Sequence, residues 1–208
     1  MAGPALLVLD MINELVHPDG KYSHVCLQQV TSRQVIDRTA EAIRRSRAAA
    51  IPVIYVVLAF SEHYQDWPRD SMLFGPPDPQ RRFRAGTWGA AIHERLTPLY
   101  GDDIVFKRRI SPFLGTSLEM LLRARDIDTV LCAGVATDLV VLSTAREAHD
   151  RGFGVTVLED ATATVDEYLQ CAAITLIART AQVAAVDDVL PAGSDSRQAQ
   201  PILAGERT

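Results

Sequence analysis

Short apolar runs recur along the chain, each of a length typical of a buried β-strand. Most are rich in valine, isoleucine and leucine and reach a charged residue only near their ends. Unbroken apolar runs of this length are characteristic of strands covered on both faces, as in parallel sheets. The runs cover residues 5–10, 52–60, 129–135, 154–160 and 181–190. A further short run at 102–108 predicts a strand whose carboxyl end lies beside that of the first.

Amphipathic segments with a helical repeat separate these runs. They cover residues 32–50, 115–126, 138–152 and 165–180. Strands that alternate with helices favour a mostly parallel sheet with helices on both faces, because the crossovers are right-handed. We therefore expect a single-domain three-layer α/β/α sandwich over residues 1–190, with a ligand site outside the carboxyl ends of the strands.

Two segments depart from this alternation. Residues 61–92 mix proline, glycine and aromatic residues without a sustained period. They predict a long loop that is either a lid or a surface excursion anchored to the core. The aromatic residues that could wall a pocket or anchor this loop are Trp67, Phe74, Phe83 and Trp88. Residues 191–208 are mostly small and polar, and they predict a C-terminal tail that is either disordered or docked on a partner, with nothing catalytic in it.

The charge balance argues against several kinds of partner. The chain has 26 acidic and 21 basic residues, a net charge of -5, and no run of five like charges, so it lacks the charge pattern of a nucleic-acid-binding or membrane-binding surface. Its first residues lack the basic region of a signal peptide. We expect a cytoplasmic protein that acts on a small molecule and binds neither nucleic acid nor membrane.

Three cysteines give little sign of a redox or metal role. Cys26, Cys132 and Cys171 are odd in number and far apart. This spacing argues against a disulfide framework and against a zinc site. We expect them to be reduced and structural.

Polar groups at three strand ends meet at the expected ligand edge. Asp10 follows the apolar residues 5–9, Lys107 follows residues 102–106, and the turn 134–138 begins where the run at 129–135 ends. Burial would raise the pKa of Asp10 and a nearby Lys107 would lower it, which can hold the carboxyl group ready for proton transfer. The alternatives are a structural ion pair, a helix-capping aspartate and an exposed basic turn at 107–109.

The turn at 134–138 leads directly into a helix. Backbone N–H groups at a helix start can hold an oxyanion. Thr137 and Asp138 are interpreted first as capping residues of that helix, and a direct contact of Thr137 with substrate is the alternative.

Three blocks of sequence, taken together, resemble one protein family. They are LLVLDMINEL, then GTWGAAIHERLTPLYGDDIVFKRRISPFLGTSLEMLL, then VLCAGVATDLVVLSTAREAHDRGFGVTVLEDATA. Their order and spacing resemble the isochorismatase-like, or cysteine hydrolase, superfamily from about residue 5 to about residue 190. The resemblance implies the same α/β/α fold and a homodimer or homotetramer. No cofactor is expected, because no glycine-rich dinucleotide-binding or phosphate-binding motif follows any strand. The apolar helix at 171–178 is a candidate interface.

The resemblance assigns catalytic roles to Asp10 and Lys107. The lysine of the family precedes a Ser-x-Phe-x-x-Thr segment, which here includes Phe113. The family's nucleophilic cysteine stands four residues before a Thr-Ala-Arg sequence, and Val140 occupies that position. Neither Cys132 nor Cys171 is placed to substitute for it.

The same resemblance makes Ala136 and Val140 the backbone oxyanion donors and implies a non-proline cis peptide between residues 135 and 136. Phe113, Thr137 and Trp88 complete the expected substrate-binding set. Nicotinamidase-like relatives carry an Asp-x-His metal pair where this chain has Ser61-Glu62-His63, so a surface loop is favoured there and no metal is expected.

The expected function is hydrolysis of a small molecule by Asp10 and Lys107 without a cysteine nucleophile. The bond is a vinyl ether, as in isochorismatases, or a C–N bond, as in the amidases of the superfamily. The alternative is a catalytically degenerate member that binds a small ligand or a partner protein. A laboratory replacement of cysteine by valine is less favoured, because serine or alanine is the usual choice.

Overall fold

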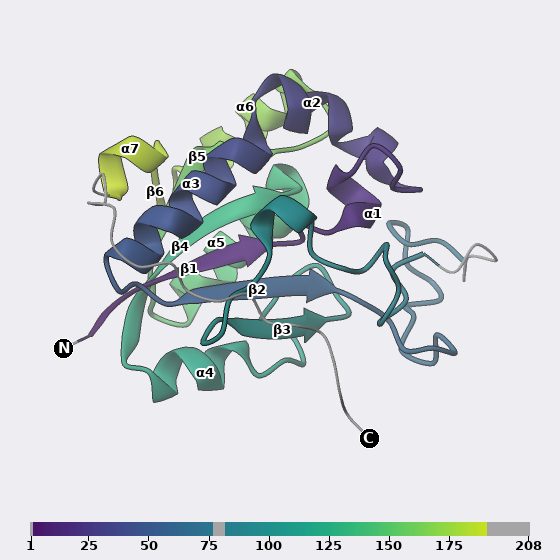
Figure 1. The fold of residues 1–208 in the computed structure, drawn as a ribbon, viewed down its shortest axis with the longest axis horizontal. Coiled ribbons are helices and arrows are strands. Elements are labelled where there is room, and N and C mark those ends of the chain that lie inside the picture. Colours follow the sequence, from purple (N-terminus) through teal and green to yellow (C-terminus); the bar gives the residue numbers. More distant parts are fainter. Residues whose placement is uncertain (1, 77–81, 191–208) are drawn as a thin grey trace.

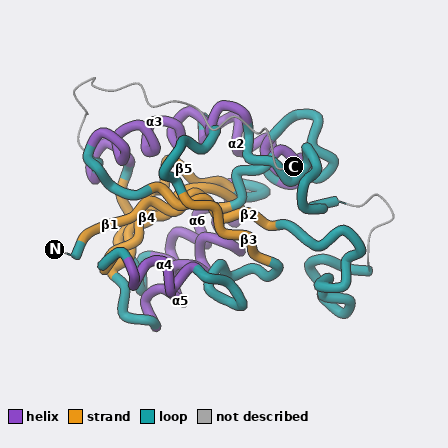
Figure 2. Tube along the Cα trace, turned by 60° about the horizontal axis from the view of Figure 1, so that its bottom comes forward, coloured by secondary structure: helices purple, strands orange, loops and turns teal. Residues whose placement is uncertain are grey.

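The structure is a computed structural model that describes residues 2–76 and 82–190. Six parallel strands form one sheet in the order β3-β2-β1-β4-β5-β6. Helices cover both faces of the sheet (Figures 1 and 2). The expectation of a three-layer α/β/α sandwich is confirmed. The strands are β1 (Gly3–Leu9), β2 (Val53–Leu58), β3 (Asp103–Lys107), β4 (Ile127–Val135), β5 (Gly154–Ala163) and β6 (Gln182–Ala184).

The two helical layers enclose two apolar cores. Helices α2 and α3 lie on one face of the sheet, and α4, α5 and α6 lie on the other (Figure 2). Residues that alternate along β1 divide between the two cores, so that Leu7 faces one and Leu6 the other. The α-helices are α1 (Asn13–Val16), α2 (Leu27–Ser32), α3 (Val35–Ala48), α4 (Leu118–Ala124), α5 (Leu142–Asp150), α6 (Glu167–Ile177) and α7 (Val186–Val189). Shorter turns are η1 (Ser23–Val25), η2 (Glu94–Leu96) and the π-helix η3 (Thr137–Val141).

The end of the domain differs from the pattern. The apolar run at 181–190 predicts one strand, but β6 spans only Gln182–Ala184 and α7 begins at Val186. The Val186 N–H donates to Asp160 Oδ1 over 2.9 Å, and Asp187 forms ion pairs with Arg38 and Arg45. These polar contacts fix a helical turn where hydrophobicity alone favours a strand.

The position of β3 in the sheet also differs from the prediction. Its carboxyl end was expected beside that of β1, but β3 is one strand further from β1. It pairs with β2, and β2 separates it from β1. The side chain of its last residue nevertheless reaches the end of β1, so the polar groups meet although the strands are not adjacent.

Glycine is required where β1 and β4 approach each other beside the site. Gly134 has φ +122, and a Cβ atom there would lie 2.0 Å from the Leu9 carbonyl oxygen. Any side chain would therefore force the two strands apart one residue before Asp10.

Candidate functional site

Asp10 occupies a sharp bend at the end of β1. Its φ is +50, in the left-handed region that aspartate tolerates better than most residues. Its N–H donates to the Val56 carbonyl oxygen over 2.9 Å, which continues the pairing with β2. The bend turns the side chain into the protein, where it is only 1% exposed.

A lysine from β3 meets this carboxylate. Lys107 Nζ lies 2.7 Å from Asp10 Oδ2, and both side chains are 1% exposed. The same nitrogen donates to the carbonyl oxygens of Arg109 and Ile110, each over 3.1 Å. An ammonium group has three protons, so these three contacts use all of them and fix the position of Lys107. The second carboxylate oxygen, Asp10 Oδ1, accepts the Leu58 N–H over 2.9 Å.

The two opposing effects that the sequence predicts on the pKa of Asp10 are both present in the structure. Burial raises the pKa of Asp10, and the charge and hydrogen bond of Lys107 and the Leu58 N–H lower it by a smaller amount. Together, these effects leave the pKa of Asp10 above its ordinary value. The carboxyl group can therefore hold a proton at a pH where a solvated aspartate has lost it.

The turn after β4 forms a third side of the site. Its Val135–Ala136 peptide is cis, as the family resemblance implies. The Ala136 carbonyl oxygen accepts the N–H groups of Leu139, Val140 and Val141 over 3.3, 2.8 and 3.1 Å, and the helix starts as a π-helix. The Val140 N–H is thus already engaged within the turn.

The capping roles expected in this turn are wrong. Neither Thr137 nor Asp138 caps the helix, which begins from Ala136 without a side-chain hydrogen bond. Asp138 instead accepts a hydrogen bond from the Thr164 hydroxyl after β5. Thr137 is fully buried, and its hydroxyl has no hydrogen-bond partner among the described residues.

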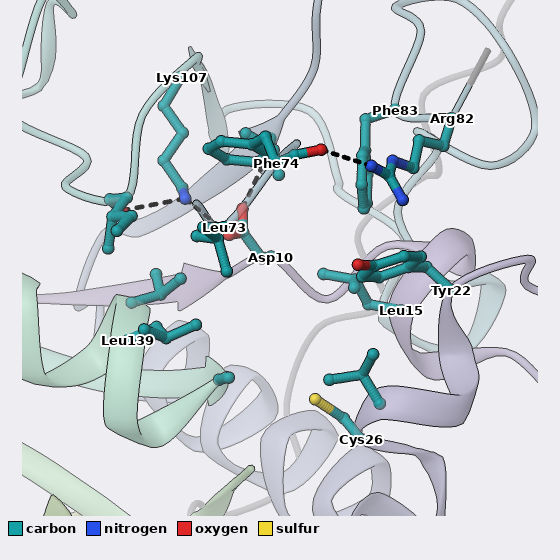
Figure 3. A pocket seen from close by; sticks show the side chains of 15 residues that line it. Asp10, Leu15, Tyr22, Cys26, Leu73, Phe74, Arg82, Phe83, Lys107 and Leu139 are labelled. Carbon is teal, nitrogen blue, oxygen red and sulfur yellow. Dashed lines mark hydrogen bonds and ion pairs between the residues drawn. The ribbon is translucent and has the colours of Figure 1, made fainter. Parts of the chain in front are cut away.

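A cavity of about 90 Å³ brings four of the expected site residues together. Asp10, Lys107, Ala136 and Val140 all line it, and Figure 3 shows the Asp10–Lys107 pair at its wall. The rest of the lining is mainly hydrocarbon, from Leu15, Val25, Leu58, Leu73, Phe74, Phe83, Ile110 and Leu139. The charged pair therefore faces an apolar space.

Three expected substrate contacts lie outside this lining. Phe113 is 5% exposed and stacks on Phe153 in the core, with ring centroids 6.2 Å apart. Trp88 is 53% exposed and packs edge-on against His17. Thr137, the third, is buried within the π-helix. The family segment around Phe113 therefore contributes a core residue here, and Trp88 contributes to the surface.

Aromatic residues of the long segment at 61–92 pack into the core, and some of them also line the cavity. Trp67, Phe74 and Phe83 join one apolar cluster with Phe60, which agrees with the anchoring interpretation. Phe74 and Phe83, together with Leu73, also line the cavity. The structure does not describe residues 77–81.

Sequence reasoning missed the aliphatic residues of the lining and also three that carry a polar group: Tyr22, Cys26 and Arg82. The Arg82 guanidinium lies 4.6 Å from the centroid of the Tyr22 ring and donates to the Phe74 carbonyl oxygen over 2.6 Å. Cys26 is 2% exposed, and burial together with the negative charge of Asp138 raises the pKa of its thiol to about 12. No periodicity marks residues 22–26, because they reach the cavity through irregular turns after β1.

The structure gives no support to a metal pair at residues 61–63. His63 is exposed, and Glu62 forms an ion pair with Arg84 over 3.6 Å. Within residues 2–76 and 82–190, no three His, Cys, Asp or Glu side chains gather as metal ligands. Over the same residues, no helix has both the length and the apolar character needed to cross a membrane.

This arrangement can supply a proton or accept one beside an apolar surface. Asp10 has the geometry and the raised pKa of a general acid or base, and Lys107 positions it and balances its charge. The thiol that lines the cavity, Cys26, is held in its protonated form, which is a poor nucleophile.

Comparison with known proteins identifies relatives along most of the chain. The isochorismatase domain matches residues 4–188. A ureidoacrylate amidohydrolase of Methylorubrum extorquens is 33% identical over 169 residues, which cover 76% of this chain and 68% of that protein. An N-carbamoylsarcosine amidase of Thermoplasma acidophilum is 30% identical, with a TM-score of 0.74 over 90% of this chain and 98% of that one. A cysteine hydrolase of Pseudomonas syringae has a TM-score of 0.81 and 27% identity, over 89% of this chain and 90% of that one.

Proposed function

The chain belongs to the isochorismatase family of hydrolases, and from this we propose that it hydrolyses a small molecule through Asp10 without a cysteine nucleophile. The observation that carries this proposal is the fully buried Asp10–Lys107 pair in the wall of an apolar cavity. A buried ion pair is a costly feature that hydrophobic residues could replace in a purely structural role. A raised carboxyl pKa at a cavity is typical of catalytic acids and bases.

The proposed absence of a thiol mechanism rests on Val140. This residue occupies the position where the family resemblance expects the nucleophile, and its side chain carries no group that can attack a carbonyl. Cys26 has a pKa of about 12 and is almost entirely protonated at neutral pH. Cys132 is fully buried within β4 and does not line the cavity.

For a vinyl ether, the proposed reaction begins with proton transfer from the Asp10 carboxylic acid to the terminal vinyl carbon. The resulting oxocarbenium ion takes up water, which returns a proton to Asp10, and the hemiketal then breaks its C–O bond to give an alcohol and a carbonyl product. The apolar cavity favours the protonated acid that the first step needs. Lys107 stabilises the carboxylate formed when that proton leaves.

For a C–N bond, the same carboxyl group acts first as a base. Asp10 removes a proton from water as the water oxygen attacks the carbonyl carbon, and it then passes that proton to the leaving nitrogen. The Ala136 N–H is the expected donor to the oxyanion. The names of two relatives, an amidohydrolase and an amidase, favour this bond class.

One observation favours the alternative of a ligand-binding protein without catalysis. The Val140 N–H, expected as the second oxyanion donor, donates to the Ala136 carbonyl oxygen over 2.8 Å. A tetrahedral intermediate would then have one fewer donor, which affects C–N hydrolysis much more than protonation of a vinyl carbon. Hydrolysis of a vinyl ether therefore depends less on the hydrogen-bond donors of this turn than hydrolysis of a C–N bond does.

The expected setting of the reaction is part of the same proposal. We place the protein in the cytoplasm as a homodimer or homotetramer acting on a small-molecule substrate, with no nucleic-acid partner. The support is the charge balance of the chain and its family resemblance.

The test is a screen of the purified protein against enol ethers, amides, ureas and carbamoyl compounds, followed by mass spectrometry. Asp10→Asn keeps the size of the side chain but removes the acid, and we expect turnover to fall by about 10²–10⁴-fold. Asp128→Asn is the matched control, because Asp128 is exposed at the opposite, amino-terminal end of β4. Equal turnover by wild type and Asp10→Asn would overturn the assignment of Asp10. Tight ligand binding without turnover would support the non-catalytic alternative.

A further inference from the structure

The turn that follows β3 determines where the Lys107 ammonium group lies. Lys107 Nζ donates to the carbonyl oxygens of Arg109 and Ile110, each over 3.1 Å, and lies 2.7 Å from Asp10 Oδ2 (Figure 3). The ammonium group stays against Asp10 only while these two carbonyl groups keep their positions. A residue that fixes the turn at 108–110 therefore also fixes the positive charge beside the proposed acid.

Asp66 contacts this turn from a different part of the chain, the long segment at 61–92. Its carboxylate accepts a hydrogen bond from Arg108 Nε over 2.7 Å, and its backbone carbonyl oxygen accepts one from the Arg109 guanidinium over 3.0 Å. The Arg109 guanidinium also donates to the Arg108 carbonyl oxygen over 2.6 Å. One residue of the long segment thus binds two consecutive residues of the turn.

The Asp66 carboxylate is itself held in place. Asp66 Oδ1 accepts the Ser61 N–H over 3.0 Å and the Ser61 hydroxyl over 2.8 Å. Ser61 stands three residues after Leu58, the last residue of β2, and Leu58 pairs with Lys107 in the sheet. Burial raises the pKa of Asp66, but the hydrogen bonds from Arg108 and Ser61 lower it by more, so its net pKa is below the ordinary value. Asp66 is therefore a fixed negative charge at neutral pH.

The bland interpretation is a surface ion pair that adds a little stability. The Arg108 and Asp66 side chains are 43% and 24% exposed, and pairs with this exposure contribute little to folding. What sets this pair apart is its position in a series of contacts. Asp66 binds Arg109, and the Arg109 carbonyl oxygen binds Lys107. Loss of the pair should therefore affect the site more than it affects stability.

We propose that Asp66 is a positioning residue that holds the turn at 108–110 so that Lys107 stays against Asp10. Asp66 is not part of the cavity lining and acts only through the backbone of the turn. This role rests on the proposed function, because it matters for turnover only where Asp10 and Lys107 carry the reaction.

The same residue joins the turn to the aromatic wall of the cavity. Trp67 follows Asp66 directly and packs in one apolar cluster with Phe74 and Phe83, which line the cavity. Asp66 thus fixes Lys107 relative to these rings. A substrate that packs on the rings then meets the charged pair in one orientation.

The kinetic test compares wild type with Asp66→Asn, which keeps an acceptor oxygen for Ser61 but removes the charge that binds Arg108. We expect kcat and kcat/KM to fall together by about tenfold, because a small displacement of a catalytic group is costly. Asp70→Asn is the matched control, since Asp70 is exposed in the same segment. Circular dichroism checks that each variant is folded. A change confined to KM would overturn the positioning role.

A double variant tests whether Asp66 acts through the turn. Arg108→Gln removes the other half of the same contact, so it should lower kcat by a factor similar to that of Asp66→Asn. The two substitutions together should cost no more than either alone, because the contact can be lost only once. Losses that multiply in the double variant would contradict an action through this contact.

A measurement without turnover separates this inference from the proposed reaction. Nuclear magnetic resonance of protein isotope-labelled at the aspartate carboxyl carbons follows the titration of Asp10, whose signal is absent in Asp10→Asn. With Lys107 held less firmly, the pKa of Asp10 should rise by up to about one pH unit in Asp66→Asn. Loss of the Asp66 negative charge would by itself lower the pKa of Asp10, so a rise reports the displaced lysine. Both proteins keep the other titratable groups of the cavity lining, Tyr22, Cys26 and Arg82.

The outcomes of this titration are distinct. A raised pKa of Asp10 in Asp66→Asn supports the positioning role, and if no substrate is turned over by wild type it does so while the proposed reaction fails. An Asp10 pKa that is unchanged or lower in Asp66→Asn would overturn the positioning role, even for an active enzyme.

Discussion

One wall of the cavity is charged and a neighbouring wall is apolar. Asp10 and Lys107 form the charged wall, where the oxygens and protons of the ion pair all have partners within the fold. Leu139 and Val140 belong to the apolar wall, on the turn after β4. The charged wall has the groups needed for proton transfer, whereas Leu139 and Val140 present no nucleophilic side chain to the cavity. If the proposed function holds, the contrast teaches that the acid–base part of this site can act without a covalent part.

Removing one charge of the Asp10–Lys107 pair should have the largest effect, and this effect is on stability. Lys107→Met leaves the Asp10 carboxylate buried without its counter-ion, so we expect a loss of about 3–5 kcal/mol in the free energy of unfolding at neutral pH. Urea unfolding monitored by circular dichroism measures it. Asp10→Asn combined with Lys107→Met removes both charges and should recover part of the loss. A single variant as stable as wild type would mean that the pair is not charged in the folded protein.

A nucleophile added to the apolar wall tests whether this wall lacks only a reactive side chain. Val140→Cys places a thiol in the cavity with Asp10 and Lys107, and we expect at least about a tenfold gain in hydrolysis of amides or ureas. The gain should disappear after treatment with iodoacetamide. Val140→Ser is the control of similar size, because a hydroxyl is a weaker nucleophile than a thiol. No gain with a folded Val140→Cys protein would show that the turn cannot support covalent catalysis.

The pH dependence should report on Asp10 with a smaller effect. Its pKa is raised above the ordinary value of 3.8, so hydrolysis of an enol ether should decline as pH rises through that higher pKa and the acid is lost. The free energy of unfolding should also decline as pH rises, because the folded state holds the Asp10 proton more tightly than the unfolded state does. This contribution is present below the unfolded pKa and is lost as pH rises through the folded pKa. Rate profiles and urea unfolding against pH should both lose this feature in Asp10→Asn.

The fold and the charged wall could be predicted from the sequence because they depend on local patterns. Apolar runs separated by amphipathic segments define a parallel sheet, and Asp10 and Lys107 end two of the runs. The carboxyl ends of parallel strands share one edge, so their side chains can meet even with β2 between β1 and β3.

The rest of the lining depends on contacts that no local pattern reveals. Tyr22 and Cys26 reach the cavity through irregular turns, and Phe74 and Phe83 reach it from a long loop. Thr137 and Asp138 resemble capping residues, but the π-helix draws its first hydrogen bonds to the Ala136 carbonyl oxygen. Phe113 belongs to a family segment, yet its neighbour Phe153 holds it in the core.

The most direct test of thiol-free catalysis is turnover by a protein that contains no cysteine. Cys26→Ala, Cys132→Ala and Cys171→Ala together remove every thiol in the chain, and a substrate identified with the wild-type protein is then assayed. The account predicts that turnover is retained in the folded cysteine-free protein and lost when Asp10→Asn is added. Loss of turnover in the folded cysteine-free protein, with full activity in wild type, would contradict it and assign the chemistry to a thiol.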